Sequence, residues 1–464
     1  MSESVTGATL AALDPEELRD WVEQQRWYAS KSRHVTHVDV LEAATLGSEP
    51  PLLVLALLQT GFATGTHEIY QLPLGMRPAS DTVIEPITVT SDWAVYDALG
   101  DPDLGRRLLR WIDDTGELEG EHGRFSFHLV NGRLDIGKDT PVRPMGVEQS
   151  NSSLVFGDEV IAKLFRKLEP GLNPELEMLR FLTAHGFENI APLYGWAEYE
   201  GDSLSATLAV VQRFFADGTG GWELALEELA REPDGFLDRL ATLGEVTARM
   251  HTVLASDATD PAFSAEEPSQ EALSLLTATV DEDIERIFAR LPDLDVLEPI
   301  AGTGQNVQER LSMLSKIGTG GRVIRTHGDY HLGQTLSTPR GWVILDFEGE
   351  PARSLPERRH KRSPLRDVAG MLRSFAYVAS AARIQLGVEV PGDWEERARA
   401  KFLAHYLEHV EPSLLPHGEQ AVRNLLTVFE LEKAVYELRY ELDNRPDWVS
   451  IPVAGIRRML DDES

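Results

Sequence analysis

The most informative part of this sequence is Arg325-Thr-His-Gly-Asp-Tyr-His-Leu-Gly-Gln-Thr335, followed by Val343-Ile-Leu-Asp-Phe-Glu-Gly-Glu350. The two segments predict two short β-strands, each adjacent to carboxylates, with Gln334 between them. Carboxylate and amide oxygens are the ligands that Mg²⁺ prefers, and a carboxylate can also accept a proton. A hairpin turn with incidental acidic residues is the alternative interpretation.

The order and spacing of these residues fit phosphoryl transfer, which needs a base to orient a hydroxyl group and oxygen ligands to hold Mg²⁺ on a nucleotide. We predict that Asp329 is the base and that Gln334 and Asp346 are metal ligands. Gln334 follows Asp329 by five positions, as Asn does in the protein-kinase loop H-R-D-L-x-x-x-N. Strand alternation places Glu348 and Glu350 on the face of Asp346. Glu348 is therefore a further candidate ligand, whereas Glu350 is expected to bind the basic segment that follows.

The loop resembles that of the aminoglycoside-phosphotransferase-like kinases, which carry H-G-D-x-x-x-x-N/Q. The run Asp346–Met371 is similar to actinobacterial maltokinases, as are Arg26-Trp-Tyr-Ala-Ser-Lys31, Glu148-Gln-Ser-Asn-Ser-Ser153 and Asn444-Arg-Pro-Asp-Trp448. The resemblance covers nearly the whole chain. It implies a bilobal, protein-kinase-like α+β fold with an N-terminal cap and a mostly helical C-lobe. It also implies an enzyme that uses ATP and Mg²⁺ to phosphorylate maltose at its anomeric hydroxyl, for glycogen or α-glucan synthesis.

Length and composition indicate a folded protein of several units. A chain of 464 residues, 42% of them hydrophobic, is too long for one ordinary core, so two or three packed units are expected. We predict an α+β cap over residues 1–90, a small nucleotide-binding lobe over 91–215, and a helical lobe with the catalytic loop and sugar site over 216–464. No segment approaches the ~18 consecutive apolar residues of a membrane-spanning helix, and no signal core is evident. A cytoplasmic location is expected.

The formal net charge of −32 argues against a nucleic-acid-binding protein, which needs a basic surface to neutralise phosphates. The acidic residues are dispersed, as is typical of a solvated surface. ATP must therefore be held by local cations and Mg²⁺. The sequence contains no cysteine, which excludes disulfides and thiol catalysis and leaves oxygen and nitrogen as metal ligands.

Hydrophobic periodicity and capping residues predict mostly strands before residue 215 and mostly helices after Trp222, apart from the hairpin at 323–347. Asp14 and Pro15 begin a helix over residues 14–24, as N-cap and first helical residue. The expected strands are 37–41, 52–58, 67–73, 125–130, 153–156, 160–164, 193–198 and 206–214. The other expected helices are 94–99, 104–112, 173–184, one from 363 onward, and 416–460 with a break near Pro446.

The segment Val160-Ile-Ala-Lys-Leu164 closely resembles the kinase strand V-A-I-K, whose lysine pairs with the α- and β-phosphates of ATP. Lys163 is therefore the predicted phosphate-binding cation, with an ordinary surface lysine as the alternative. The helix that begins at Pro174 offers two carboxylates to fix this lysine. We expect Glu177, because Glu175 lies in the first turn, where the helix dipole already explains an acidic residue.

No G-x-G-x-x-G loop precedes this strand, and Gln149-Ser-Asn-Ser-Ser153 stands in its place. Its polar side chains, among them Gln149, Ser150 and Ser153, can contact the phosphates together with backbone amides, although such turns are also common in hairpins. The segment Val210-Val-Gln-Arg-Phe-Phe215, which includes Gln212, is expected to be the hinge that meets the adenine edge.

Several residues around the loop have predicted supporting roles. His327 is expected to be structural and to hydrogen-bond the backbone, which keeps Asp329 in place. Asp367 resembles the Asp that opens the helix after the metal site in this superfamily, and is expected to brace the loop through that histidine. His331 is assigned either to packing or to substrate contact. The cations of Glu357-Arg-Arg-His-Lys-Arg362, with Arg366, either form a solvated loop or balance the metal-site acids and attract an anionic substrate.

Sugar recognition needs carboxylates and amides for the hydroxyl groups and an aromatic platform. The segment Tyr436-Glu-Leu-Arg-Tyr-Glu-Leu-Asp-Asn-Arg-Pro-Asp-Trp448 offers all of these. The candidates are Tyr436, Glu437, Tyr440, Arg445 and Trp448. Aromatic residues at helical spacing are more often core residues, so it is the family resemblance that favours this segment.

The leading hypothesis is a sugar 1-kinase that makes maltose 1-phosphate. The first alternative is a glucosamine kinase of the same fold, in which Glu437, Glu441 and Asp443 would bind the ammonium group. The second is a regulatory or scaffolding protein that binds an enzyme of glycogen or trehalose metabolism, such as a trehalose synthase-type enzyme. Lys163, Asp329, Gln334 and Asp346 together argue against it, because a binding module has no need of all four.

Overall fold

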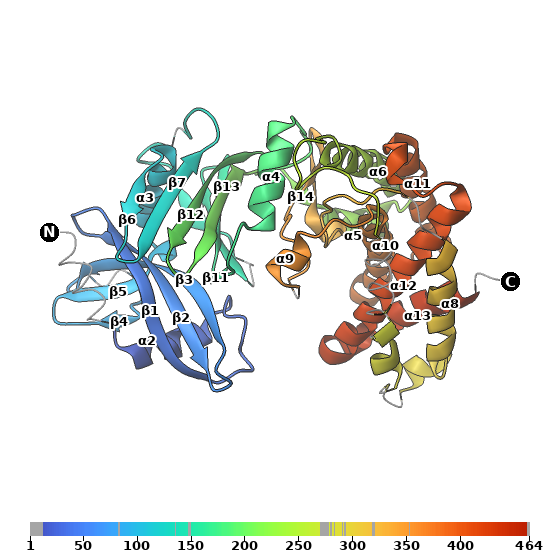
Figure 1. Cartoon of the computed structure of the whole chain (residues 1–464), viewed down its shortest axis with the longest axis horizontal. Helices are drawn as coiled ribbons and strands as arrows, with labels where there is room; N and C mark the ends of the chain where they lie inside the picture. The colour runs from blue at the N-terminus through green and yellow to red at the C-terminus, as the bar shows by residue number, and fades with distance from the viewer. Residues whose placement is uncertain are drawn as a thin grey trace. The chain divides into compact units, whose positions relative to one another are not determined.

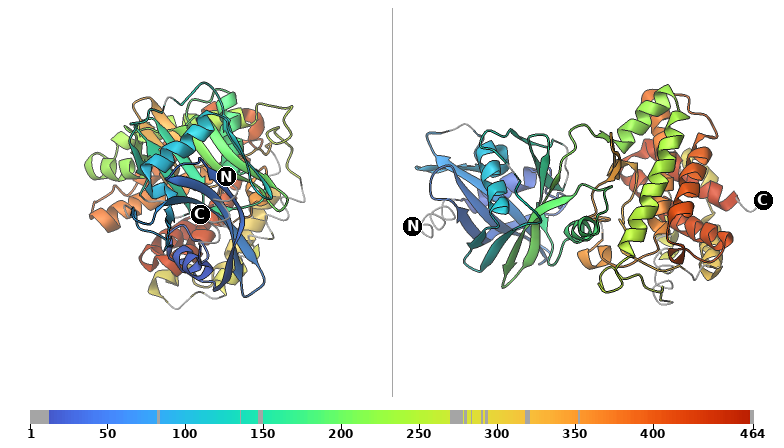
Figure 2. Two further views of the ribbon diagram at one scale, coloured as in Figure 1. Left: turned by 90° about the vertical axis from the view of Figure 1, so that its left-hand side faces the viewer. Right: turned by 90° about the horizontal axis from the view of Figure 1, so that it is seen from above.

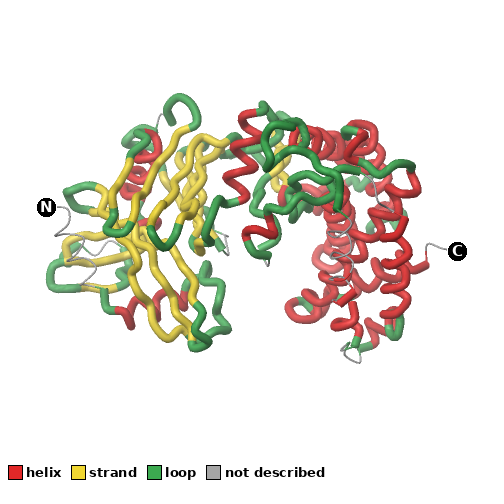
Figure 3. The backbone as a smooth tube through the Cα atoms, viewed as in Figure 1, coloured by secondary structure: helices red, strands yellow, loops and turns green. Residues whose placement is uncertain are grey.

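The computed structural model describes residues 13–461, except residues 82–83, 135, 147–149, 270–277, 279–280, 283, 290, 292–293, 318–320 and 352. The chain divides into two compact units. The first comprises the chain up to Thr183 and Ala191–Ala216, and the second comprises Ala184–Ile190 and the chain from Asp217 onward. The predicted boundary between residues 215 and 216 lies beside the end of the first unit. Strands predominate in the first unit and helices in the second (Figure 3).

The first sheet of the first unit is antiparallel and carries a helix against it (Figure 1). Its strands, in spatial order, are β1 (Val35–Leu46), β2 (Leu52–Phe62), β3 (His67–Pro78), β5 (Trp93–Asp97) and β4 (Thr88–Val89), with β11 (Lys167–Leu168) paired to β3. Helix α2 (Pro15–Gln24) begins as predicted, because the Asp14 side chain accepts a hydrogen bond from the backbone N–H of Glu16 at 2.8 Å.

The Arg26–Lys31 segment packs the core of this sheet. Trp27 and Tyr28 are both buried, and their ring centroids lie 5.7 Å and 5.5 Å from that of Tyr70 on β3. Leu18 and Val22 of α2 belong to the same core. The segment therefore helps to hold the cap sheet together.

The helix predicted over residues 94–99 is wrong. Strand β5 occupies Trp93–Asp97 and pairs with β3 from Trp93 opposite Pro78 to Asp97 opposite Leu74. Only Ala98–Gly100 (η1) forms a 3₁₀ turn, opened by the Asp97 side chain, which accepts a hydrogen bond from Leu99 N at 3.0 Å. Pairing in the sheet thus overrides the local helical pattern. The next helix, α3 (Pro102–Asp113), lies where the sequence predicts one.

The second sheet of the first unit carries the kinase-like strand. Its strands, in spatial order, are β6 (Glu117–Glu119), β7 (Gly123–Leu129), β12 (Leu193–Gly201), β13 (Ser205–Arg213), β10 (Val160–Phe165), β9 (Asn151–Phe156) and β8 (Val142–Pro144). Ser153 lies opposite Lys163, and Gln212 lies opposite Ile161. Because directly opposed residues and residues two apart along a strand share a face, Ser153, Lys163 and Gln212 lie on the same face.

Direct hydrogen bonds join the two sheets within the first unit. Gln71 of β3 donates from Nε2 to the carbonyl oxygen of Phe165 at 2.7 Å, and also donates to that of Leu208. The Glu42 carboxylate of β1 accepts a hydrogen bond from the backbone N–H of His122 at 2.8 Å. Such contacts explain why the cap and the small lobe form one compact unit.

The second unit is built from helices around a small sheet. The α-helices of its described residues include α5 (Gly221–Arg231), α6 (Gly235–Leu254), α8 (Gly304–Ile317), α9 (Leu355–Arg358), α10 (Leu365–Leu386), α11 (Trp394–His409), α12 (Glu419–Asn444) and α13 (Ser450–Asp461). The sheet contains β14 (Thr219–Gly220), β15 (Thr335–Thr338) and β16 (Gly341–Ile344). The predicted break near Pro446 is the 3₁₀ turn η5 (Pro446–Trp448). No helix among the described residues is both long and apolar enough to span a membrane.

Helices α6 and α11 pack closely in the second unit. A Cβ atom on Gly244 of α6 would lie 2.4 Å from the carbonyl oxygen of Phe402 on α11, so this approach requires glycine. The second view in Figure 2 shows α6, in yellow-green, among the orange and red helices of the later chain. This pair of helices supports the catalytic loop, as described below.

Candidate active site

The catalytic loop is fixed by its own backbone and by His327. The His327 ring donates from Nε2 to the carbonyl oxygen of Leu345 at 2.8 Å. Its other nitrogen, Nδ1, accepts a long hydrogen bond from the backbone N–H of Asp329 at 3.4 Å. The ring therefore ties the loop to the chain just before Asp346. These contacts are those of a structural residue rather than of a proton acceptor for the substrate.

Asp367, near the start of α10, braces the same loop. Its carboxylate accepts hydrogen bonds from the backbone N–H of His327 at 2.7 Å and of Gly328 at 2.9 Å, so it binds the main chain of the loop and not the His327 ring. Burial alone would raise the pKa of Asp367. The hydrogen bonds from His251 and from the backbone N–H of Gly328 help to outweigh burial, so the pKa of Asp367 lies below its usual value.

Two residues behind Asp367 were missed by sequence reasoning. His251 of α6 lies 3.1 Å from Asp367 through Nε2, and its Nδ1 lies 2.9 Å from the hydroxyl oxygen of Tyr406 on α11. All three side chains are buried. His251 and Tyr406 lie on apolar helical faces, where nothing in the sequence distinguishes them from core residues.

Gln334 and Asp346 lie together at the loop end of the small sheet. Gln334 Nε2 donates to Asp346 Oδ2 at 3.0 Å, which leaves the amide oxygen of Gln334 as the atom that could bind a metal ion. Asp346 has a positive φ of 63°, an uncommon backbone conformation that places its carboxylate against this amide. An amide oxygen beside a carboxylate suits Mg²⁺. Glu348 follows two residues later, and its carbonyl oxygen accepts a hydrogen bond from Arg358 at 3.4 Å.

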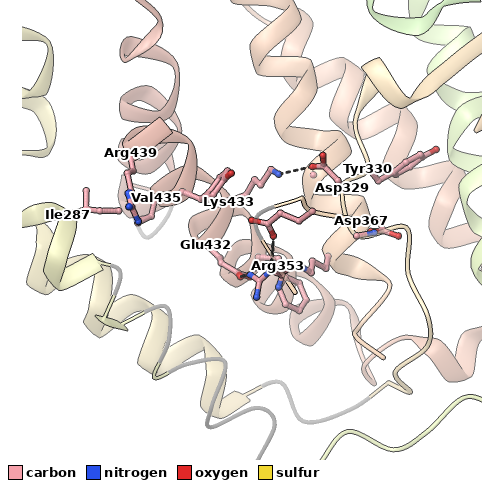
Figure 4. A pocket seen from close by; sticks show the side chains of 15 residues that line it. Ile287, Asp329, Tyr330, Arg353, Asp367, Glu432, Lys433, Val435 and Arg439 are labelled. Carbon is pink, nitrogen blue, oxygen red and sulfur yellow. Dashed lines mark hydrogen bonds and ion pairs between the residues drawn. The ribbon is translucent and has the colours of Figure 1, made fainter. Parts of the chain in front are cut away.

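A pocket of the second unit surrounds Asp329 (Figure 4). Its lining residues are Ile287, Gly328, Asp329, Tyr330, Glu350, Arg353, Arg366, Asp367, Gly370, Phe429, Glu432, Lys433, Val435, Tyr436 and Arg439. Lys433 of α12 points toward Asp329, with Nζ 3.3 Å from Oδ1. Burial would lower the pKa of Lys433, but the negative charges of Asp329, Glu437 and Glu350 outweigh burial and raise it. Lys433 is therefore a charged partner of Asp329.

The two glutamates of this pocket are each paired with arginine. Arg353 donates from Nε to Glu350 at 2.8 Å, and Arg366 lies 2.9 Å from Glu432. Cross contacts of 3.7 Å (Arg353 to Glu432) and 4.0 Å (Arg366 to Glu350) close the group into one network. Glu350 is thus held chiefly by Arg353, which precedes the predicted basic segment, and its contact with that segment is the 4.0 Å approach of Arg366. Arg366, the residue of the basic region that takes part in this network, is in an ion pair with Glu432, which favours the charge-balancing interpretation for Arg366.

His331 lies beside Asp329, the predicted base. Its Nδ1 accepts a hydrogen bond from the backbone N–H of Gly333 at 3.0 Å, and its Nε2 lies 3.9 Å from Asp329 Oδ2. Desolvation lowers the pKa of His331 by more than Asp329 raises it. His331 therefore has one hydrogen bond within its own loop and one contact with Asp329. It is not among the residues that line the pocket.

The residues predicted to hold the nucleotide lie in the first unit. Lys163 forms an ion pair of 2.8 Å with Glu175, the carboxylate that sequence reasoning rejected in favour of Glu177. Gln212 donates to the same Glu175 at 3.2 Å, so its side chain fixes the partner of Lys163. The Asn173 side chain caps this helix, because it accepts a hydrogen bond from the backbone N–H of Glu175 at 2.8 Å.

The polar turn ahead of β9 is described in part. Gln149 lies outside the described residues. Ser150 is exposed directly before β9, and Ser153 is buried opposite Lys163. Ser153, Lys163, Glu175 and Gln212 therefore form a polar group on one face of the second sheet.

Most residues predicted to bind sugar lie outside the pocket around Asp329; Tyr436 is the exception. Glu437 accepts hydrogen bonds from buried Arg373 at 3.0 and 2.7 Å. Trp448 stacks on Tyr377, with centroids 6.2 Å apart.

Arg445 belongs to a neighbouring cluster. It donates to Glu441 at 2.8 Å and lies over the rings of Tyr440 and Trp448, at 5.2 and 4.8 Å. Glu437, Tyr440, Arg445 and Trp448 do not line the pocket around Asp329, so they would not belong to a sugar site built there. Glu432, Lys433 and Arg439 line it instead and were missed. Their i, i+3 and i+4 spacing from Tyr436 was the available signal.

Comparison with known proteins agrees with this architecture. Residues 21–101 match the maltokinase N-terminal cap domain, and residues 141–349 match the phosphotransferase enzyme family. A glucosamine kinase of Mycolicibacterium smegmatis is 29% identical over 74% of this chain and 84% of its own length. A glucosamine kinase of Streptacidiphilus jiangxiensis is 25% identical over 69% of this chain and 74% of its own.

The solved structure of a glucosamine kinase in complex with glucosamine, ADP and inorganic phosphate has the same fold, with a TM-score of 0.71 and 20% identity over 97% of this chain and 98% of that one. The fold and the matched domains define a phosphotransferase of the aminoglycoside-phosphotransferase type. Within that class, the chain resembles maltokinases, because a maltokinase-type N-terminal cap precedes its phosphotransferase domain.

Proposed function

We propose that this protein is an ATP-dependent sugar kinase that phosphorylates maltose at its anomeric hydroxyl to give maltose 1-phosphate. The observation that carries the proposal is the pocket around Asp329, in which both glutamates are paired with arginines and the base is paired with Lys433. A polar pocket with balanced charges suits a neutral sugar. The maltokinase-type cap supports the same substrate class.

Each group has a separate task in the proposed reaction. Asp329 accepts the proton of the anomeric hydroxyl as its oxygen forms a bond to the γ-phosphorus of ATP, and ADP leaves. Lys433 holds the Asp329 carboxylate, and the partly exposed ring of Tyr436 offers a surface for a sugar ring. Lys163, fixed by Glu175, binds the phosphates of ATP. Gln334 and Asp346 would hold Mg²⁺, which neutralises charge that develops on the phosphates.

A glucosamine kinase is the second candidate, favoured by the names of the curated relatives. Its ammonium group would need a carboxylate to bind. The three carboxylates expected for this purpose do not line the pocket, and Glu350 and Glu432, which do, are paired with arginine. Lys433 would also repel a cationic substrate placed next to Asp329. These contacts support a neutral acceptor.

A panel of sugars tests the proposal. Purified protein with ATP and Mg²⁺ is assayed for ADP release with maltose, glucose, glucosamine and trehalose, and ³¹P NMR locates the phosphate on the product. We expect kcat/KM for maltose to exceed that for glucose, which lacks the second ring, by ~10-fold or more. Trehalose should not react, because both of its anomeric hydroxyls are blocked. If glucosamine is turned over in preference to maltose, the protein is a glucosamine kinase and not a maltokinase. If no sugar is turned over, a scaffolding protein is favoured.

Removal of the proposed metal ligands should affect the dependence of activity on Mg²⁺. We expect Asp346→Ala to lower kcat by ~10²-fold or more, because a charged ligand is lost. Gln334→Ala should have a smaller effect, since its amide oxygen is neutral. Titration of activity with MgCl₂ measures both, with Asp346→Asn and Gln334→Glu as shape-conserving controls. Full activity of Asp346→Ala, or turnover in excess chelator, would contradict the metal assignment.

A further inference from the structure

We propose that His405 and His409 of α11, together with Glu245 of α6, form a second metal site that binds a transition-metal ion such as Zn²⁺. One ligand atom from each of the three residues lies within 4.8 Å of the others. None of the three lines the pocket around Asp329. The proposal is independent of the proposed sugar kinase activity.

The two histidines are arranged as a helical chelating pair. They are four residues apart on α11, so both side chains lie on the same face of the helix. Their rings are nearly parallel, with an interplanar angle of 6° and centroids 6.3 Å apart. Histidines at this spacing are a common way for one helix to supply two metal ligands.

A hydrogen bond fixes the tautomer of His409. The Nδ1 atom of His409 lies 2.8 Å from the carbonyl oxygen of His405. Because a carbonyl oxygen can only accept, the proton is on Nδ1 and the lone pair is on Nε2. The Nδ1 atom of His405 lies 3.0 Å from a carboxylate oxygen of Glu245, so an ion that replaced the proton between these two atoms would have both as ligands. Metal-binding histidines usually donate their other N–H to a carbonyl or carboxylate, as His409 does.

The donor set selects the class of metal. Neutral imidazole nitrogens with one carboxylate suit Zn²⁺, Co²⁺, Ni²⁺ or Cu²⁺, whereas Mg²⁺ prefers oxygen alone. The Glu245 carboxylate and His405 Nδ1 offer two ligand atoms, and His409 Nε2 offers the third. Glu245 and His405 are partly exposed and His409 is exposed, so an ion can enter from solution and water can complete its coordination.

A bound ion would link the two helices that support the catalytic loop. Tyr406, next to His405 on α11, lies 2.9 Å from His251 of α6, and His251 lies 3.1 Å from Asp367. An ion held between α6 and α11 would oppose their separation. Binding to the folded state alone raises stability, so Zn²⁺ should raise Tm.

The test uses untagged, full-length protein and ZnCl₂ as the only added metal, without nucleotide. All variants carry Asp346→Asn, so that Zn²⁺ binding at the proposed Mg²⁺ ligands is weakened. Affinity is measured by competition with a chromophoric zinc chelator, and Tm is measured with and without ZnCl₂. Substitution of CoCl₂ provides the visible absorption of a nitrogen-ligated ion as a third readout.

We expect His405→Ala and His409→Ala each to weaken Zn²⁺ binding by about 10-fold or more and to abolish the Zn²⁺-dependent rise in Tm. His417→Ala, at an exposed histidine outside the cluster, is the matched control and should behave like the parent protein. His409 is exposed, so its substitution should leave the Tm of the metal-free protein unchanged. Equal Zn²⁺ affinity in the parent and both variants, or no micromolar binding by the parent, would overturn the proposal.

Discussion

Asp329→Asn is expected to lower kcat by ~10²-fold or more, while the Kd for ATP stays near that of the unchanged protein. Asparagine conserves the shape of the side chain but cannot accept the proton of the sugar hydroxyl. The loop should keep its position, because His327 and Asp367 hold it through backbone hydrogen bonds that do not involve the Asp329 side chain. Steady-state kinetics with maltose and calorimetric titration with ATP measure the two quantities.

Asp443→Asn is the matched control for this substitution. Asp443 is exposed on α12 and does not line the pocket, so the same chemical change there should leave kcat unaltered. The Asp329 variant also removes the charged partner of Lys433, so KM for the sugar is reported separately from kcat. Near-normal turnover of Asp329→Asn would exclude Asp329 as the base.

The catalytic loop could be predicted from the sequence because its contacts are local. Asp329, Gln334 and Asp346 lie within one hairpin, and the pairing of Thr335 with Ile344 fixes how its two arms align. That register brings the Gln334 amide within 3.0 Å of Asp346. Residue types and spacing therefore predicted that Gln334 and Asp346 lie close together, and the family resemblance suggested that they serve phosphoryl transfer.

Contacts between elements far apart in the sequence could not be predicted in the same way. Which of Glu175 and Glu177 reaches Lys163 depends on how helix α4 (Pro174–Ala184) is rotated against the second sheet. Residues two positions apart on a helix point in directions that differ by more than half a turn. Likewise, His251 and Tyr406 meet Asp367 only because α6 and α11 pack closely at Gly244. No local pattern encodes these distances.

The segment Tyr436–Trp448 illustrates a further limit. Its residue types suit a sugar site, but a helix presents each residue to only one side, and composition does not say which side faces the base. Tyr436 faces the pocket, whereas Glu437, the next residue, faces α10. The residue types of this segment therefore did not predict which of its side chains line the pocket. Glu432 and Lys433, which precede the segment, line the pocket together with Tyr436.

The segment Arg26–Lys31 of the cap has a structural role, which the family resemblance alone did not indicate. Trp27 lies under the guanidinium group of Arg166, 4.9 Å from the ring centroid. Arg166 is buried, donates from Nε to Ser152 at 2.8 Å and pairs with Asp97 at 2.6 Å. Arg166 follows Lys163 by three residues, and Ser152 precedes Ser153. The cap is thus packed directly against the strands that carry the proposed nucleotide-binding residues.

Glu437 was predicted from the sequence to bind sugar, but in the structure it pairs with the buried Arg373. The Arg373 side chain is 1% exposed, and two of its nitrogens donate to the same carboxylate oxygen of Glu437. Burial opposes the charged guanidinium, but the negative charge of Glu437 outweighs burial and raises the pKa of Arg373. Removing one partner of such a pair leaves a buried charge without compensation.

Glu437→Ala is therefore expected to lower the free energy of unfolding by about 3–5 kcal/mol, measured by urea denaturation, with KM for maltose unchanged in the folded protein. Tyr440→Ala, at an exposed position on the same helix, should change stability little. The double variant Arg373→Met/Glu437→Leu should recover much of the lost stability, because apolar residues can replace a buried ion pair. If Glu437→Ala instead unfolded at the urea concentration of the unchanged protein and raised KM for maltose, Glu437 would belong to the sugar site and α12 would present a different face to the base.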